Sequence, residues 1–339
     1  MKLWLHDWLL RHWYGEWPIW VLIPSTWVFV ILTTLRRGLY RVGILLPGSL
    51  PVPVIVIGNI NIGGSGKTPF TLWLCRVLRE AGYKPGIITR GYGGKSRRWP
   101  QLATADSDPR EVGDEAVLLA GRSGVPVAVG QDRIAAATLL IERHKLDLIL
   151  SDDGLQHYRL PRRVEIIMLD GRRGLGNGWR LPAGPLREAA GRLQEADFVV
   201  VKNGETLPDE APADAVHMRL ELTGAVSLAD GSHRRLEDFA GQRVHAVAGI
   251  ADPDQFFAAL AAHGLRADGR ALPDHAAPDP RALVFDDELP VFMTEKDAVK
   301  CKAMRLENHW YVTAEADIGD TDRARLLPDL ITRLMHHPD

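Results

Sequence analysis

The stretch Val54-Ile-Val-Ile-Gly-Asn-Ile-Asn-Ile-Gly-Gly-Ser-Gly-Lys-Thr68 decides the fold class of this chain. A short β-branched run enters a glycine-rich loop, and the loop ends in Gly66-Lys67-Thr68 at the start of an amphipathic segment. This order is typical of a phosphate-binding loop (P-loop), in which backbone N–H groups and a helix N-terminus surround a polyphosphate. In such a loop Lys67 reaches the terminal phosphates and the Thr68 hydroxyl binds Mg²⁺. The stretch therefore predicts a nucleoside triphosphate site.

The predicted nucleotide site covers the whole loop. The general motif begins with glycine where this chain has Asn61, and asparagine adopts left-handed backbone angles more readily than most residues, so we expect the turn to survive. The competing interpretation is an ordinary glycine-rich turn before a helix, which the preceding strand and the register of Lys-Thr disfavour. The residues expected to bind the nucleotide are Asn61, Ile62, Gly63, Gly64, Ser65, Gly66, Lys67 and Thr68.

Length and composition indicate a globular protein of one large or two ordinary domains. The chain has 339 residues, of which 46% are hydrophobic and 25% charged. Its net charge of −2 offers no bulk attraction to nucleic acid, so we expect no nucleic-acid partner. The two cysteines, Cys75 and Cys301, have no spacing typical of a metal site or disulfide framework, which fits a reducing cytosolic setting.

The N-terminal segment combines tryptophans with a long uncharged run. Residues 17–35 carry no charge and precede Arg36, Arg37 and Arg41. A continuous helix of this length would span about 28 Å, close to a bilayer core, although Pro24 would interrupt it. Three interpretations compete: a kinked transmembrane helix, an interfacial helix and a buried core helix. The tryptophans favour the membrane, and the arginines place the remaining chain on its cytoplasmic side.

From residue 54 onward, short apolar runs alternate with helical segments. This alternation predicts a mostly parallel sheet with helices on both faces, and ligands at the carboxyl ends of its strands. The expected strands are 54–57, 86–89, 125–129, 146–150, 164–169 and 198–201, and the expected helices are 68–81, 114–120 and 132–144.

A second α/β pattern follows a loop at residues 207–214. Two alternating runs, 217–222 and 225–229, are separated by Thr223-Gly224, which predicts a hairpin. Strands are then expected at 244–250 and 291–293, with a helix at 252–263 between them. We therefore expect an α/β protein with a P-loop lobe and a smaller C-terminal α/β lobe. The expected segments are a membrane-associated helix in 1–45, the P-loop core in 46–212, a hairpin linker in 213–235 and the second lobe in 236–339.

Two segments of the first lobe carry candidate metal and phosphate ligands. An apolar strand ends in Asp152-Asp153, the arrangement that holds Mg²⁺ beside Thr68 in P-loop enzymes. In the proline-rich loop 181–188, Glu188 could complete a metal shell and Arg187 could neutralise phosphoryl charge, or both could begin a solvated helix.

Other polar positions have both functional and ordinary explanations. Asp114 begins a helical run, where a helix N-cap is the default and a general base requires that it face the cleft. Thr294 and Asp297 have capping-box spacing. The remaining candidates are substrate contacts from Arg90, Tyr92, Gln156 and His157, and the loop histidine His275.

These motifs, taken in order, resemble the tetraacyldisaccharide 4′-kinases of lipid A biosynthesis. The matching segments, which run through both lobes, are 58–59 with 63–69, 90–93, 112–115, 152–157, 176–178, 181–188, 273–275 and 294–300. The tryptophan-rich N-terminus fits as well. Asn61 looks ordinary for this family, whose loop departs there from the general pattern.

The resemblance implies a membrane-associated kinase at the cytoplasmic face of a Gram-negative inner membrane. It implies that this kinase uses ATP and Mg²⁺ to phosphorylate the 4′-hydroxyl of a tetraacylated glucosamine disaccharide 1-phosphate. It implies Asp114 as catalytic base, His275 as its partner, and Asp152, Asp153 and Glu188 around the metal. Arg187 is expected to bind phosphate.

The alternative is a membrane-recruited P-loop ATPase or GTPase switch that acts through partner binding. The guanine-specifying motif Asn-Lys-x-Asp is absent from the sequence, and Val201-Lys-Asn-Gly204 resembles it only loosely. A switch would hydrolyse nucleotide slowly without phosphorylating a small molecule.

Overall fold

The computed structural model of the chain describes residues 2–204, 207–273, 280–302, 304 and 306–335. Its strands are β1 (Val54–Gly58), β2 (Pro85–Thr89), β3 (Gln101–Ala103), β4 (Val127–Val129), β5 (Leu148–Asp152), β6 (Val164–Asp170), β7 (Phe198–Lys202), β8 (Val216–Ser227), β9 (His233–Arg234), β10 (Arg243–Ala248), β11 (Arg266–Ala271), β12 (Val291–Thr294) and β13 (His309–Asp317). Its helices are α1 (Lys2–Trp13), α2 (Ile23–Arg41), α3 (Lys67–Glu80), α4 (Pro109–Val112), α5 (Asp114–Ser123), α6 (Arg133–Arg143), α7 (Pro253–Ala262), α8 (Pro280–Leu283), α9 (Glu295–Cys301) and α10 (Asp320–Met335), with short 3₁₀ turns η1 (Trp20–Leu22), η2 (Ala190–Gln194) and η3 (Leu236–Phe239).

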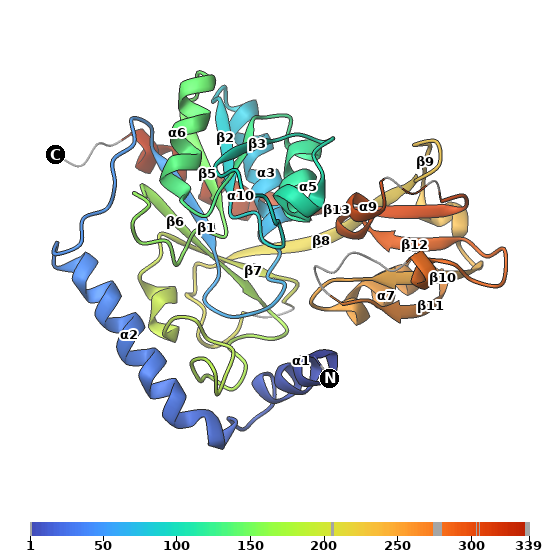
Figure 1. Cartoon of the computed structure of the whole chain (residues 1–339), viewed down its shortest axis with the longest axis horizontal. Helices are drawn as coiled ribbons and strands as arrows, with labels where there is room; N and C mark the ends of the chain where they lie inside the picture. The colour runs from blue at the N-terminus through green and yellow to red at the C-terminus, as the bar shows by residue number, and fades with distance from the viewer. Residues whose placement is uncertain (1, 205–206, 274–279, 303, 305, 336–339) are drawn as a thin grey trace.

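The described strands form one continuous sheet that runs through two lobes (Figure 1). Their order is β11-β10-β12-β13-β8-β7-β6-β1-β5-β2-β4-β3, with β9 paired to β8. Strand β1 lies between β5 and β6, parallel to both, and all five of its residues are buried. Burial on both faces explains why this strand is an uninterrupted apolar run. The predicted mostly parallel α/β fold is confirmed.

The first lobe has apolar cores on both faces of its sheet. One core joins α3, α5 and α10 to the strands, and includes Phe70, Leu119 and Leu326. The other face is covered by α6, through Ala136 and Leu140, and by the loops that follow β6. Strands and helices therefore alternate as predicted, and in such folds ligands bind at the carboxyl ends of the strands.

The predicted hairpin turn at Thr223-Gly224 is wrong. Residues 216–227 form one strand, β8, which pairs in parallel with β7 and antiparallel with β13. Thr223 is the extra residue of a β-bulge, because Thr313 pairs with Gly224 and Ala314 pairs with Leu222. A glycine inside an alternating strand marks a bulge here rather than a turn.

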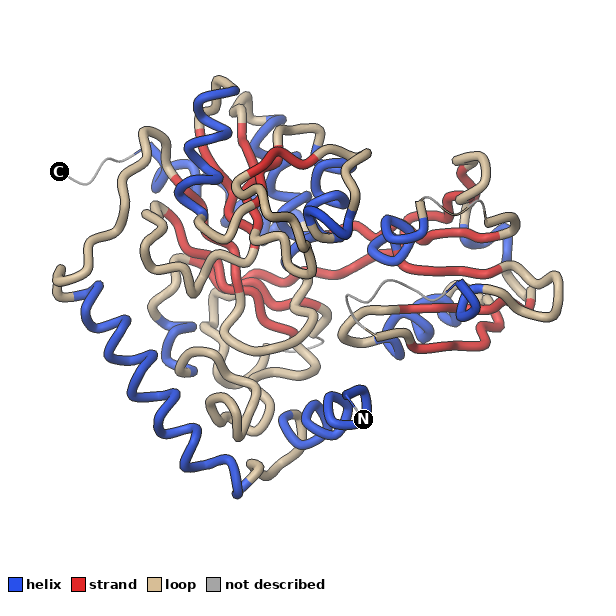
Figure 2. The backbone as a smooth tube through the Cα atoms, viewed as in Figure 1, coloured by secondary structure: helices blue, strands red, loops and turns tan. Residues whose placement is uncertain are grey.

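The second lobe extends the same sheet beyond the bulge. Strands β10 to β13 are mutually parallel, and apolar cores lie on both of their faces. Figure 2 shows β8 and β13 running side by side between the two lobes. Helix α10 then returns to the first lobe, where Leu326 and Leu330 join its core. Packing therefore places residues 320–335 with the first lobe, although the sequence assigned them to the second.

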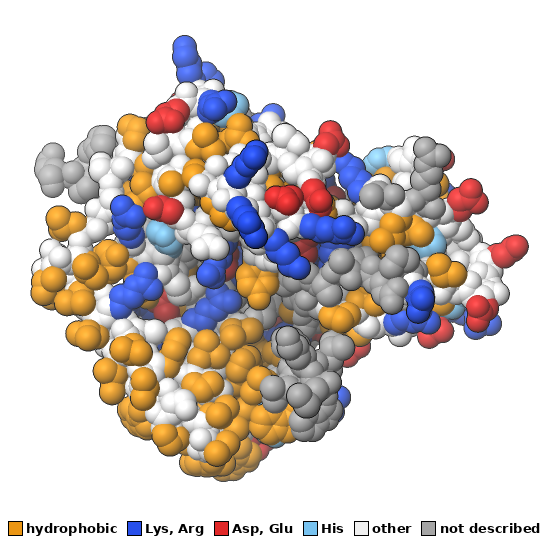
Figure 3. Space-filling view, in the orientation of Figure 1, with side chains coloured by type: hydrophobic (Ala, Val, Ile, Leu, Met, Phe, Trp, Pro, Cys, Tyr) orange, Lys and Arg blue, Asp and Glu red, His pale blue; other side chains and the backbone are white. Residues whose placement is uncertain are grey.

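Helix α2 of the N-terminal segment lies against the first lobe with apolar side chains facing outward. Pro24 sits in the first turn of α2, so it starts this helix instead of interrupting a longer one. Trp27, Ile31 and Leu35 are each about 60% exposed, which rules out the buried core helix. Figure 3 shows hydrophobic side chains gathered along this edge of the molecule. Among the described residues, no helix has both the length and the hydropathy needed to cross a bilayer.

Candidate active site

The loop between β1 and α3 wraps tightly at the carboxyl end of the sheet. Gly63 and Gly66 have φ angles of 132° and 77°, in the region that favours glycine. A Cβ atom on Gly66 would lie 2.8 Å from Cδ of Lys202 and 2.9 Å from Cε of Met218. Glycine at position 66 is therefore required by both the backbone angle and the packing, and the loop leads directly into the N-terminus of α3.

The first turn of α3 faces the two carboxylates that end β5. Lys67 Nζ lies 3.1 Å from Asn59 Oδ1 and 3.4 Å from Asp153 Oδ1. Thr68 donates a hydrogen bond to Asp152 Oδ2 at 3.4 Å. The structure thus brings together the residues that the sequence proposed for phosphate and Mg²⁺.

The pKa values of the adjacent carboxyl groups of Asp152 and Asp153 are shifted in opposite directions. The pKa of Asp152 is raised from 3.8 to about 7, mainly by burial and also by the charge of Glu115, while the charge of Lys67 opposes the rise. Lys67 is the main cause of a lowered pKa at Asp153. A buried carboxyl group beside a threonine hydroxyl suits a divalent cation, which would stabilise its ionised form.

The donors present fit Mg²⁺ better than a metal enclosed by protein. In the part of the chain that the structure describes, no group of three or more His, Cys, Asp or Glu side chains could hold a metal ion. Thr68, Asp152 and Asp153 would therefore supply only part of a coordination shell. Phosphate and water oxygens usually complete the shell of Mg²⁺, so these three residues fit it.

Asn61 stabilises the loop by hydrogen bonding and not by a left-handed backbone. Among the described residues other than glycine, positive φ angles occur at Asp153, Asn203 and Asn308. The buried amide of Asn61 donates to the carbonyl oxygen of Gly174 at 3.0 Å, tying the P-loop to the loop after β6. The explanation of Asn61 through left-handed backbone angles is wrong.

Arg187 and Glu188 do not begin a solvated helix. Arg187 Nη1 lies 3.7 Å from Asp153 Oδ1, close to Lys67, where it can contact a phosphoryl group. Glu188 is 3% exposed and accepts hydrogen bonds from Gln156 and Arg192, both at 2.9 Å. Gln156 also donates to the carbonyl oxygen of Asn59, so this carboxylate braces the site; its role as a metal ligand stays a prediction.

Asp114 is the first residue of α5, and the N-cap is Gly113. Gly113 has a φ of 91°, and a Cβ there would lie 2.6 Å from the carbonyl oxygen of Tyr92. The side chain of Asp114 is buried, accepts a hydrogen bond from the N–H of Glu115 at 2.9 Å, and lies 3.8 Å from Lys300 Nζ. The default interpretation of Asp114 as a helix cap is therefore wrong.

The four predicted substrate residues lie on two loops: Arg90 and Tyr92 follow β2, and Gln156 and His157 follow β5. Tyr92 is 56% exposed, and its loop packs against residues 111–113. Arg90 is exposed. Burial is the main cause of the lowered pKa of Arg133, and the charge of Arg90 contributes to it. His157 is half-buried, and burial is the main cause of its lowered pKa. His275 lies outside the described residues.

Thr294 and Asp297 cap α9 as their spacing predicts. The hydroxyl of Thr294 accepts from the N–H of Asp297 at 3.2 Å and donates to the carboxylate of Asp297 at 2.6 Å. The same carboxylate accepts the N–H of Gly249 at 2.8 Å, so the capping residue also fixes the end of β10.

Sequence reasoning missed Lys202 and Asp170, two charged residues beneath the P-loop. Lys202 Nζ lies 2.8 Å from Asp170 Oδ2 and donates to the carbonyl oxygen of Gly64 at 2.8 Å. They end neighbouring strands and pair across the sheet. The sequence does carry a signal for this pair, because Asp170 and Lys202 each end a buried, mostly apolar strand.

A second missed contact joins the N-terminal segment to the P-loop. The hydroxyl group of Tyr14 donates to the carbonyl oxygen of Ile62, and burial raises the pKa of Tyr14 to about 12. The guanidinium of Arg173 lies 5.1 Å from the centre of the Tyr14 ring and 3.0 Å from Asp252 of the second lobe. Isolated Tyr and Arg residues carry no sequence signal for such a contact.

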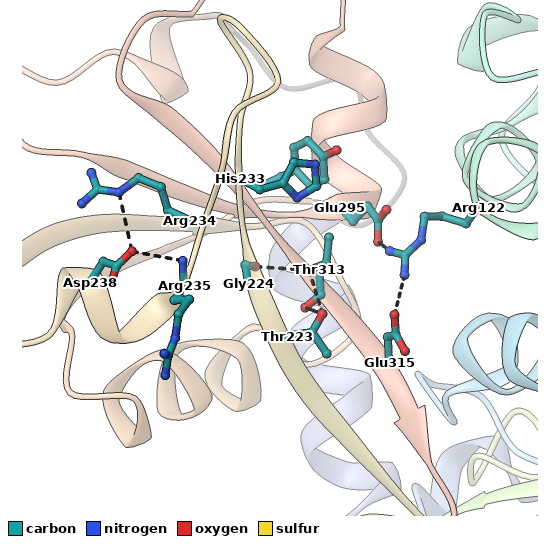
Figure 4. Close-up of a pocket in the computed structure, with 11 residues that line it drawn as sticks. Arg122, Thr223, Gly224, His233, Arg234, Arg235, Asp238, Glu295, Thr313 and Glu315 are labelled. Carbon is teal, nitrogen blue, oxygen red and sulfur yellow. Dashed lines mark hydrogen bonds and ion pairs between the residues drawn. The ribbon is translucent and has the colours of Figure 1, made fainter.

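A cavity of about 570 Å³ lies away from these residues, at the crossing between the lobes. It is bordered by the bulge residues Thr223 and Thr313, whose hydroxyl groups are 2.8 Å apart. In Figure 4, Arg122 of α5 reaches Glu295 of α9 at 2.6 Å and Glu315 of β13 at 3.4 Å. This cavity is part of the connection between the lobes and not of the phosphate site.

A parallel sheet, a glycine-rich loop with Lys-Thr, and two carboxylates at the neighbouring strand end define a P-loop phosphotransferase. The family description "Tetraacyldisaccharide-1-P 4′-kinase" (LpxK) matches residues 18–332. The chain belongs to this family.

Relatives and a solved structure agree along nearly the whole chain. The tetraacyldisaccharide 4′-kinase of Methylobacillus flagellatus is 47% identical, over 97% of this chain and 97% of its own length. That of Nitrosococcus oceani is 44% identical, over 94% of this chain and 93% of its own. The crystal structure of LpxK from Aquifex aeolicus in complex with ATP has a TM-score of 0.77 and 27% identity, and covers 93% of this chain and 99% of that one.

Proposed function

We propose that this chain transfers the γ-phosphate of ATP to the 4′-hydroxyl of a tetraacylated glucosamine disaccharide 1-phosphate. Its family supplies the reaction, and the observation that carries the site is the convergence of Lys67, Thr68, Asp152 and Asp153 at one end of the sheet. Glu115, the neighbour of Asp114, lies close enough to Asp152 for its charge to raise the pKa of that carboxyl group.

The residues of the P-loop hold the nucleotide. Backbone N–H groups of residues 61–66 and the N-terminus of α3 surround the phosphates, and Lys67 neutralises the terminal ones. Thr68, Asp152 and Asp153 would hold Mg²⁺, with Glu188 as a further candidate. When bound, Mg²⁺ neutralises the charge that develops on the phosphoryl oxygens.

Asp114 acts as the base for the attacking hydroxyl. A sugar hydroxyl is a poor nucleophile, so the enzyme must orient it, accept its proton and neutralise the transferring phosphoryl group. Asp114 accepts that proton at a carboxylate oxygen, with His275 proposed as its partner, while Lys67 and Arg187 neutralise the phosphoryl group. Arg90, Tyr92, Gln156 and His157 are the proposed substrate contacts.

The exposed apolar face of α2 seats the enzyme on the bilayer that holds its substrate. An acylated disaccharide leaves a membrane only at a cost of about 0.8 kcal/mol per buried CH₂ group, so the enzyme must come to the lipid. Trp27, Ile31 and Leu35 provide an apolar surface with an aromatic residue suited to the interface. Arg36 and Arg41, in the last turns of α2, would attract anionic headgroups, which suits the cytoplasmic face of the inner membrane.

The decisive experiment incubates the protein with labelled ATP and the disaccharide lipid in detergent micelles. We expect label to appear in the lipid at the 4′ position, and only with Mg²⁺ present. A folded, ATP-binding protein that releases inorganic phosphate and leaves the lipid unlabelled would instead support the P-loop switch.

A further inference from the structure

Helices α5 and α9 belong to different lobes and meet through a row of oppositely charged side chains. Arg122 pairs with Glu295 at 2.6 Å, and Glu115 pairs with Lys296 at 3.3 Å. At the N-terminal end of α5, Lys300 Nζ lies 3.8 Å from Asp114 Oδ2. The second lobe therefore delivers a cation to the carboxylate that we propose as the catalytic base.

Lys300 is held rigidly in a buried environment. Its side chain is 7% exposed, and its ammonium group lies 2.8 Å from Asp297 Oδ1. Asp297 is itself fixed, because its other oxygen accepts hydrogen bonds from the hydroxyl of Thr294 and from the N–H of Gly249. A lysine whose partner carboxylate is locked in this way has few orientations available.

The position of Lys300 is not explained by helix capping or by its pair with Asp297 alone. Lysine is rarely buried, and an i,i+3 pair can form at the surface of a helix without a desolvation cost. Here the ammonium group instead occupies the interface between the lobes, with one carboxylate from each. Two carboxylates, one from each lobe, therefore share one buried ammonium group.

We infer that Lys300 is a positioning residue for Asp114: it orients the carboxylate and keeps it ionised when the two lobes are together. This inference rests on the proposed function and extends it. Because Lys300 belongs to the second lobe, the base is aligned only in the arrangement in which α9 docks on α5.

The test measures steady-state kinase activity of two substitutions at position 300. Lys300→Gln removes the charge but can still donate to Asp297, so it should fold; we expect a fall in kcat of about 10²-fold, the usual effect of a misplaced group. The KM for ATP should change less than about twofold, because the P-loop is untouched. Lys300→Arg restores the charge and should recover most of the lost activity.

Lys302→Gln is the matched control for lobe docking. Lys302 lies just after the end of α9 and also reaches the first lobe, where its ammonium group is 3.0 Å from Asp106. Its side chain is 58% exposed, and it pairs with Asp106 instead of Asp114. Its substitution should leave kcat within about twofold. An equal loss of kcat in Lys302→Gln and Lys300→Gln would overturn the positioning role, as would a Lys300→Gln effect confined to KM.

A double variant separates this inference from the assignment of the base. If Lys300 acts through Asp114, the double variant Asp114→Asn/Lys300→Gln should be no slower than Asp114→Asn alone. Independent, multiplicative losses would contradict the inference while keeping Asp114. A fully active Asp114→Asn would remove the base itself, and with it this role of Lys300.

Discussion

The ammonium group of Lys202 lies 2.8 Å from the carboxylate of Asp170, and both side chains are buried beneath the P-loop. The same ammonium group donates to the carbonyl oxygen of Gly64 and lies 3.3 Å from Gln255 of the second lobe. One buried ion pair therefore supports the nucleotide loop from below and contacts the opposite lobe.

Replacing Lys202 with methionine should destabilise the protein strongly. The change removes the ion-pair partner of the buried Asp170 carboxylate, which typically costs about 3 kcal/mol or more. Chemical denaturation followed by circular dichroism measures the loss. The double variant Lys202→Met/Asp170→Leu should recover much of it, and equal stability of Lys202→Met and the parent would contradict the assigned role.

Replacing Asp114 with alanine should abolish turnover while ATP still binds. Loss of a general base lowers the rate by at least about 10²-fold, whereas the P-loop residues that hold the nucleotide are unchanged. Initial rates with the lipid substrate and equilibrium binding of a fluorescent ATP analogue give the two quantities. Full activity of this variant would exclude Asp114 as the base.

Mg²⁺ binding should strengthen as pH rises toward 7. Burial raises the pKa of Asp152 from 3.8 to about 7, so the metal-free folded protein keeps a proton there that the unfolded chain releases. The folded state binds more protons in this window, and the contribution of Asp152 to stability therefore falls from about pH 4 to about pH 7. Mg²⁺ must displace that proton.

Melting temperatures with and without Mg²⁺ between pH 5 and pH 8 check this prediction. The stabilisation by Mg²⁺ should grow with pH in the parent protein and lose most of that dependence in Asp152→Asn. A pH dependence of the same size in both proteins would show that another group is responsible.

Replacing Tyr14 with phenylalanine should weaken ATP binding without affecting membrane attachment. The substitution keeps the ring beneath Arg173 but removes the hydrogen bond to the carbonyl oxygen of Ile62. Such a bond contributes about 1 kcal/mol, which is roughly a fivefold change in affinity. Calorimetric titration with ATP measures the effect. Unchanged affinity would mean that this contact does not order the loop.

Charged substitutions on α2 should release the protein from membranes. Ile31 and Leu32 are 62% and 61% exposed, and glutamates at both positions would oppose insertion of this face into an interface. Val284→Glu is the matched control, because Val284 is equally exposed but lies in the second lobe. Co-sedimentation with liposomes measures attachment. Equal pelleting of all three proteins would refute the anchoring role of α2.

The sequence predicted the parts of the fold in which local pattern and tertiary environment agree. Buried strands such as β1 are continuous apolar runs, and the helix after the P-loop starts within one residue of its predicted start. The predicted hairpin failed because Thr223-Gly224 was read as a turn, whereas its pairing with β13, some 90 residues away, makes it a bulge. Long-range pairing of this kind leaves little local signal.

The candidate site likewise contains residues that local motifs identify and residues that only tertiary contacts bring to the loop. Lys67, Thr68, Asp152 and Asp153 lie in motifs whose spacing carries their chemistry, and the structure places them together. Lys202 and Tyr14 act on the loop from other parts of the chain, by contacts that no local motif encodes. Residues that support a site through tertiary packing therefore escape sequence reasoning more readily than those that touch the ligand.

The paired strands β8 and β13, which join the two lobes, also bear on how the two-lobed chain could have evolved. The chain leaves the first lobe along β8 and returns along the adjacent antiparallel strand β13, and α10 then packs on the first lobe. Residues 224–313 are thus inserted between two neighbouring positions of one hairpin. A phosphate-binding domain with a short loop at this point could acquire the second lobe in a single insertion without reordering a strand of its own sheet.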